Sequence, residues 1–189
     1  MSNSEHPSNK PILELAALVL VFGFSAALIW FDQYCKALAL LNLVPGQVVS
    51  VLNLPFAGDV CILTLTWNTG AFLGIGAGNS GWFHVLTMIA IPAIALLAMS
   101  AWLFRPLVAG LSARPKIRIG FELRIGLGLF IAGGAGNLID RIREGKVVDF
   151  LNFGVGSLRT GIMNVADLYI ALGLAALIVY YFRNRTRKV

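Results

Sequence analysis

Residues 119–138, with the sequence IGFELRIGLGLFIAGGAGNL, decide the fold of this chain. Apart from Glu122 and Arg124 near the start and Asn137 near the end, every residue in this stretch is apolar or small. A helix needs about 20 such residues to cross a bilayer. Small residues on a membrane helix also let neighbouring helices approach closely. The stretch therefore predicts a transmembrane helix with a close-packing face, made by Gly126, Gly128, Gly133, Gly134 and Gly136.

Three further apolar runs have the length of a membrane span, at about residues 12–31, 82–104 and 162–182. Hydrophobic residues make up 58% of the chain and charged residues 13%, whereas soluble domains average roughly 45–50% and 25%. This composition excludes a soluble enzyme. It predicts one integral membrane domain over 12–182, between a polar tail at 1–11 and a basic tail at 183–189. Pro92 is expected to kink the second helix.

The first run could instead be a cleaved signal peptide, because Lys10 precedes it and it contains the small residues Ser25, Ala26 and Ala27. Its apolar part, however, exceeds the roughly 7–15 residues of a signal-peptide core and continues without a break to Asp32. We therefore expect an uncleaved transmembrane helix here.

Nine of the fifteen Lys and Arg residues lie in three flanks of the predicted spans, whereas those of the other two connections are roughly balanced by acidic residues. With four spans, all three flanks are on the same side of the membrane, which the positive-inside rule makes the cytoplasmic side. Both termini are then cytoplasmic, and the connections 32–81 and 139–161 face outward. The charges are Lys10, Arg105, Arg114, Lys116, Arg118, Arg183, Arg185, Arg187 and Lys188.

The first outward connection contains two stretches rich in β-branched residues. These are residues 48–52 (VVSVL) and 60–66 (VCILTLT), bounded by turn residues at 45–46 and 57–59. We expect two or three short strands in a small sheet on the outer membrane surface. The predicted fold class is an all-α membrane protein with four transmembrane helices and a small outward-facing β segment between helices one and two. The second connection, 139–161, is expected to be a loop.

Ionisable and amide side chains gather at the predicted outer ends of these helices. Asp32 and Lys36 are four residues apart and can pair on one helix face, and Asn164 and Asp167 are three apart and share a face. Asp167 is expected about one turn, roughly 7 Å, inside the fourth span. The other polar residues at this level are Asn68, Asn137, Asp140, Arg141 and Asp149.

Several of these residues also have simpler interpretations. Asp32 and Lys36 could form an interfacial ion pair that ends a span, Arg141 could extend to the headgroups, and Asp149 could be an ordinary loop carboxylate. Asp167 fits such an explanation poorly, because its side chain is short and a charge at mid-bilayer costs at least ~2.5–3.5 kcal/mol. A buried carboxylate of this kind is a candidate functional residue.

Two aspartates at one membrane interface predict chemistry with a shared proton. If Asp149 and Asp167 meet, both cannot ionise easily, so one keeps a proton while the other accepts a proton from water. Gly154, Gly156 and Gly161 allow the intervening chain to fold back and bring them together. A transporter would carry such carboxylates nearer mid-bilayer, often with repeat symmetry. A non-catalytic membrane scaffold would need no cluster of Asn and Asp.

Five motifs in this order resemble those of bacterial lipoprotein signal peptidase (signal peptidase II). They are Asp32-Gln33-Tyr34-Cys35-Lys36, Asn68-Thr69-Gly70-Ala71-Phe72, Gly136-Asn137-Leu138-Ile139-Asp140-Arg141, Val147-Val148-Asp149-Phe150 and Asn164-Val165-Ala166-Asp167. The resemblance covers roughly residues 30–182 and extends to the four-span layout.

The resemblance implies an aspartyl endopeptidase of the bacterial plasma (inner) membrane. Such enzymes cut the signal peptide from prolipoproteins just before a cysteine that carries diacylglycerol. The implied active site lies near the outer leaflet, with Asp149 and Asp167 as the catalytic pair. The residues implied to support or line it are Asp32, Lys36, Asn68, Gly70, Asn137, Asp140, Arg141 and Asn164.

The same resemblance defines the expected partners. These are the lipid-modified precursor and membrane lipids, with no nucleic acid and with the chain as a monomer. No metal and no organic cofactor is expected. His6 and His84 are the only histidines, and Cys35 and Cys61 lack Cys-x-x-Cys spacing.

Overall fold

A computed structural model describes residues 10–70, 81–111 and 119–185 of the chain. Within these ranges, four helical segments are long and apolar enough to cross a membrane. The first is α1 (Lys10–Asn42), the third is α5 (Phe121–Glu144) and the fourth is α6 (Val165–Arg185). The second consists of α2 (Gly81–Val85), the π-helix η2 (Leu86–Ala90), α3 (Ile91–Leu103) and α4 (Arg105–Leu111). The predicted four-span layout is confirmed.

Two helix boundaries differ from the prediction, and both differences affect the polar residues. Helix α1 continues to Asn42, so Asp32 and Lys36 lie inside the helix instead of ending it. Their charges did not end the helix because both are buried and paired. Helix α6 begins at Val165, which places Asp167 in the first turn and not one turn deeper.

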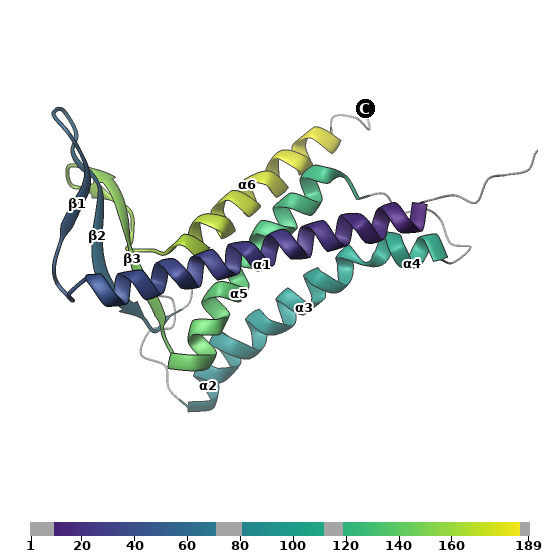
Figure 1. Cartoon of the computed structure of the whole chain (residues 1–189), viewed down its shortest axis with the longest axis horizontal. Coiled ribbons are helices and arrows are strands. Elements are labelled where there is room, and N and C mark those ends of the chain that lie inside the picture. The colour runs from purple at the N-terminus through teal and green to yellow at the C-terminus, as the bar shows by residue number, and fades with distance from the viewer. Residues whose placement is uncertain (1–9, 71–80, 112–118, 186–189) are drawn as a thin grey trace, which may run out of the picture.

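A four-stranded antiparallel sheet lies at one end of the helices, and the start of α1 and the end of α6 lie toward the opposite end (Figure 1). Its strands, in spatial order, are β1 (Val49–Leu54), β2 (Gly58–Asn68), β3 (Val147–Val155) and β4 (Leu158–Arg159). The predicted strands in the first connection are confirmed.

The connection between α5 and α6 is not the loop that the sequence suggested. It forms the hairpin of β3 and β4, and β3 pairs with β2, so that Thr66 lies opposite Asp149 and Asn68 opposite Val147. Asp149, Asn152 and Gly154 interrupt the β-forming residues of β3 and weaken its local signal. The second and third membrane spans lie between β2 and β3 in the sequence, so the pairing of these strands is non-local.

Helix α5 is the centre of the bundle. In the most apolar 18-residue stretch of α5, 50% of the residues are buried, compared with 11%, 6% and 11% in the other three spans. The other three spans therefore present most of their surface to lipid. The glycines of α5 pack against all three neighbouring spans, so the close-packing surface is not confined to one face. A Cβ added at Gly126, Gly128, Gly133 or Gly134 would meet Gly173, Ser25, Ala166 or Leu96, respectively. The predicted close-packing role is confirmed and extends to α1, α3 and α6.

The second span contains the predicted irregularity at Pro92. Proline removes one backbone donor from a helix, and the five residues before Ile91 form the π-helix η2. Local π adjustment is one way in which membrane helices accommodate proline. Thr87 in η2 also donates from Oγ1 to the carbonyl of Phe83 (2.8 Å), which satisfies one acceptor of this irregular turn.

The fold yields a topology test. Phe56, at the tip of the β1–β2 hairpin, is 88% exposed. The Lys and Arg flanks predict that the sheet is on the outer side. If so, Phe56→Cys in a chain with Cys35 and Cys61 changed to serine should react with a membrane-impermeant maleimide added outside intact cells. Tags on both termini should report the cytoplasm. A C-terminal tag that reports the outer side would contradict the four-span topology.

Candidate active site

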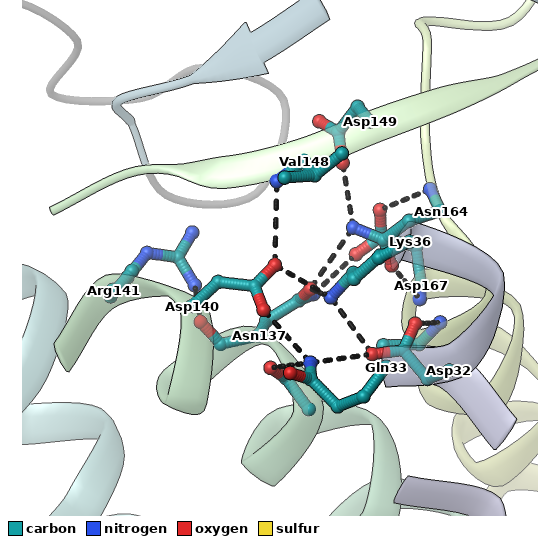
Figure 2. A network of polar contacts seen from close by, with 12 residues as sticks. Asp32, Gln33, Lys36, Asn137, Asp140, Arg141, Val148, Asp149, Asn164 and Asp167 are labelled. Carbon is teal, nitrogen blue, oxygen red and sulfur yellow. Dashed lines mark hydrogen bonds and ion pairs between the residues drawn. The ribbon is translucent and has the colours of Figure 1, made fainter. Parts of the chain in front are cut away.

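A buried polar cluster occupies the level where β3 passes over the helix ends (Figure 2). Its side chains come from α1, α5, β3 and the start of α6. Almost all of them are removed from solvent, although most carry charge. The buried members are Asp32, Lys36, Asn137, Asp140, Asp149 and Asn164.

Lys36 is the central cation of this cluster. Its ammonium lies 2.8 Å from Asp32 Oδ2 and 2.9 Å from Asp140 Oδ2, and it donates to Asn137 Oδ1 at 3.0 Å. The ammonium thus has three acceptors, which a buried charge requires. The predicted pairing of Asp32 with Lys36 is confirmed, but the pair is buried and does not end the span.

The two carboxylates beside Lys36 also hold the backbone of the neighbouring elements. Asp32 Oδ1 accepts from the backbone N–H of Ala166 in the first turn of α6 (2.8 Å), where the helix dipole favours negative charge. Asp140 Oδ2 accepts from the backbone N–H of Val148 in β3 (3.3 Å). The cluster therefore fixes the positions of both segments that carry Asp149 and Asp167.

Gln33 is a residue of this cluster that the sequence reasoning did not select. Its amide nitrogen donates to Asp140 Oδ1 (2.8 Å), to the Gly136 carbonyl (3.2 Å) and to Asp32 Oδ2 (3.3 Å). It supplies the oxygens of both carboxylates with a neutral donor. The available signal was its position inside the motif that begins at Asp32.

Asn164 and Asp167 form a reciprocal cap at the start of α6. Asn164 Oδ1 accepts from the backbone N–H of Asp167, and Asp167 Oδ2 accepts from the backbone N–H of Asn164 (both 3.1 Å). This is the geometry of a capping box, in which residues three apart satisfy each other's free donors. The Asp167 carboxylate is thereby held at the positive end of the helix dipole.

The amides of Asn164 and Asn137 connect the two candidate catalytic carboxylates. Asn164 Nδ2 donates to Asp149 Oδ1 (2.6 Å) and to Asn137 Oδ1 (3.0 Å), and Asn137 Nδ2 donates to Asp167 Oδ1 (2.8 Å). Since Lys36 and Asn164 both donate to the Asn137 oxygen, the Asn137 nitrogen must face Asp167.

Asp149 is more buried than Asp167, with 2% of its surface exposed. Burial and, to a smaller extent, the nearby charge of Asp167 together raise the pKa of Asp149 to about 6, while hydrogen bonds from Asn164 and Asn68 oppose the shift. This pattern of desolvation and a like charge is typical of a carboxyl group that keeps its proton to a higher pH than a free aspartate does.

A cavity of about 630 Å³ lies beside the two carboxylates, on the side away from the Lys36 cluster. Asp149, Asp167 and Arg141 line its polar part, while α3, α5 and α6 supply an apolar wall that includes Leu96, Phe130 and Ile170. The spacing of Asn164 and Asp167 predicts that both side chains point into one groove between the helices. This prediction is wrong for Asn164, which is fully buried and does not line the cavity. Asp32, Lys36 and Asp140 do not line the cavity either. They act from behind it.

Arg141 joins α5 to the segment that follows β2. Its Nη2 donates to the Gly70 carbonyl (2.8 Å) and its Nη1 to the Asn137 carbonyl (3.4 Å). Asn68 Oδ1 in turn accepts from the Gly70 N–H (2.9 Å). Arg141 thus braces this turn beside the cavity. Ala71 and Phe72, which complete the predicted motif that begins at Asn68, lie outside the described residues.

Within the described ranges, no group of three or more His, Cys, Asp or Glu side chains is arranged to hold a metal ion. Cys35 and Cys61 are both free thiols. The carboxylate oxygens of the site are occupied instead by Lys36, by asparagine amides and by backbone N–H groups.

Fold and site together define a multi-pass membrane protein with a buried aspartate, Asp149, and a half-buried one, Asp167, linked at one end of its helix bundle. Residues 24–183 match the protein-family model described as signal peptidase (SPase) II. The chain belongs to this family.

Individual relatives agree with this assignment. The lipoprotein signal peptidase of Chlorobium phaeobacteroides is 32% identical over 89% of this chain and 99% of its own length. That of Coxiella burnetii is 34% identical over 87% and 91%. A solved bacterial membrane enzyme has the same fold, with a TM-score of 0.71, 23% identity and 92% coverage of both chains.

The raised pKa of Asp149 predicts how stability depends on pH. The folded state binds more protons than the unfolded state between about pH 4 and 6, so stability falls as the pH rises through this window. At about 1.4 kcal/mol per pKa unit, the full penalty above pH 6 is about 3 kcal/mol.

Asp149→Asn removes this penalty. In detergent, the unfolding temperature of this variant should be higher than that of the unchanged protein at about pH 7.5, and the two should be similar at about pH 4. An equal difference at both pH values would show that Asp149 does not ionise with a raised pKa in the folded protein.

Proposed function

We propose that this protein is a membrane-embedded aspartyl endopeptidase that removes the signal peptide from prolipoproteins. We further propose that it cuts just before the cysteine that carries diacylglycerol. The observation that carries the proposal is the linked placement of Asp149 and Asp167 on one cavity, within a chain of the signal peptidase II family.

The two carboxylates divide the chemistry between them. Asp149 holds the shared proton, because burial and the neighbouring charge raise its pKa to about 6. Asp167 carries the negative charge, since its oxygens accept from Asn137 Nδ2 and from a backbone N–H at a helix N-terminus. A water between them loses a proton to Asp167 and attacks the peptide carbonyl, while Asp149 donates its proton to the carbonyl oxygen.

The protons then return to the starting arrangement. Collapse of the tetrahedral intermediate breaks the C–N bond, and the amine leaves with the proton that Asp167 took from water. Asp149 takes back a proton from a hydroxyl of the intermediate, which leaves the carboxyl group of the other product. The pair acts as one titrating unit. Asn137 and Asn164 keep both carboxylates in position throughout, because each amide binds one aspartate and the two amides bind each other.

The cavity suits an amphiphilic substrate. Its polar end carries the carboxylates and Arg141, and its apolar wall is built from helices that otherwise face lipid. A signal helix and acyl chains can therefore remain in the membrane while the scissile bond reaches the aspartates. Trp67, on β2, also lines the cavity, at a level where indole rings are favoured.

The proposed setting is the bacterial plasma (inner) membrane, with both termini in the cytoplasm and the site near the outer leaflet. The Lys and Arg flanks support this orientation. The proposed partners are the lipid-modified precursor and the surrounding lipids, and the proposed functional unit is a monomer.

Removal of either aspartate tests the proposal. Asp149→Asn and Asp167→Asn should each lower cleavage of a lipidated precursor by purified protein roughly 10³-fold or more, and the double variant should be little worse, because the two act together. The matched control is Asp59→Asn. Asp59 accepts from Ser50 and Asn53 on the outer hairpin and does not line the cavity. Full activity in either site variant, or equal loss in the control, would contradict the mechanism.

A second test concerns the planar donors of Arg141. Arg141→Lys keeps the charge but cannot bind both the Gly70 and Asn137 carbonyls in the same geometry. We expect cleavage to fall roughly 10-fold or more, because small displacements at a reacting centre have large effects on rate. Arg143→Lys is the control, since Arg143 is exposed two residues further along α5. Normal turnover of Arg141→Lys would show that Arg141 only extends toward the headgroups.

A further inference from the structure

A second cavity, of about 300 Å³, lies between α1 and α5. It is near the start of both helices, at the end of the bundle opposite to the sheet and the carboxylate pair (Figure 1). Seven of its lining residues are apolar or glycine and one is charged. They are Ala17, Leu20, Val21, Phe24, Phe121, Arg124, Ile125 and Gly128.

The charged lining residue, Arg124, has an unfilled hydrogen-bonding position. Its Nη2 pairs with Glu14, and its Nε donates to the Ile119 carbonyl (3.3 Å). Its Nη1 is buried and has no acceptor among the residues that the structure describes. Only 7% of the Arg124 side chain is exposed, so its unpaired N–H groups are costly unless a ligand supplies an acceptor.

The cavity combines an anion site with an apolar channel at the correct depths for a lipid. Glu14 and Arg124 lie within about one turn of their helix starts, roughly 5–6 Å at 1.5 Å per residue, which is headgroup level. From there the lining residues Ala17, Val21 and Phe24 continue along one face of α1. The channel ends where Ser25 Oγ donates to the Gly128 carbonyl (3.0 Å) and the helices meet.

We propose that this cavity binds one anionic phospholipid of the membrane leaflet opposite to the carboxylate pair. The lipid phosphate accepts from Arg124 Nη1, and one acyl chain lies in the channel between α1 and α5. A guanidinium group suits phosphate because its N–H donors are planar and permanently charged. Glu14 keeps the guanidinium in place by occupying Nη2.

The charge of this end of the bundle favours an anionic lipid over a zwitterionic one. Arg105 and Arg185 lie at the same end, as does Arg183, which pairs with Glu122, and further basic residues follow or precede them in the sequence. Basic residues next to a membrane attract anionic headgroups by about 1 kcal/mol each. The proposal does not rest on the peptidase assignment, because the cavity shares no residue with the carboxylate site.

The test measures binding of phosphatidylglycerol and phosphatidylcholine to the full chain in detergent, by native mass spectrometry. We expect saturable binding of phosphatidylglycerol and weaker binding of phosphatidylcholine. Ala17→Phe fills the channel without touching the ion pair and should weaken phosphatidylglycerol binding roughly 10-fold or more. Ala16→Phe is the matched control, because Ala16 is exposed and does not line the cavity.

A second variant tests the anion site separately. Glu14→Gln with Arg124→Gln removes both charges together, so no unpaired carboxylate remains, and the preference for phosphatidylglycerol should disappear. Equal binding of the two lipids to the unchanged protein, or unchanged binding to Ala17→Phe, would overturn the proposal. A dimer in detergent that Ala17→Phe dissociates would also overturn it, by assigning the cavity to a second copy of the chain. Precursor cleavage by Ala17→Phe should remain normal.

Discussion

The buried ammonium group of Lys36 is the interaction on which the outer half of the structure depends. Asp32 and Asp140 come from different membrane helices, and without a cation between them their charges would repel in a medium of low dielectric constant. With the cation in place, Asp32 accepts from the backbone N–H of Ala166 through its other oxygen, and Asp140 Oδ2 accepts from the backbone N–H of Val148 as well as from Lys36. Four elements thus meet at one charge, although a buried ion pair need not add stability by itself.

Most of the fold could be predicted from sequence because its elements are local. The four apolar runs, the glycines of α5 and the spacing of Asp32 and Lys36 each depend on residues within one helix. The hairpin of β3 and β4 could not be predicted in the same way. Its principal partner is β2, and polar residues and glycine interrupt its own β pattern, so the information that makes it a strand resides far away in the chain.

The candidate site shows the same division. The spacing of Asn164 and Asp167 predicted a shared face, and the structure adds that they form a reciprocal helix cap. Burial depth was not available from the sequence. Neither was the position of the cavity, which separates its lining residues Asp149, Asp167 and Arg141 from Asn164 and Lys36, which support them from behind. Gln33 went unnoticed because a neutral amide beside two charged residues has no distinctive signal.

The two sides of the large cavity differ in how many hydrogen bonds and ion pairs hold them, because the π-helix η2 lies on one side only. Thr87, Met88 and Pro92 line one side, where the regular helical hydrogen-bond ladder is replaced by wider turns. The opposite side carries the aspartates and is held by the capping box, the asparagine amides and the Lys36 cluster. The cavity thus has one wall that many polar contacts hold in place and one wall whose helix is irregular. We therefore expect the second span to adjust to occupants of different bulk, with the spacing of the two carboxylates unchanged.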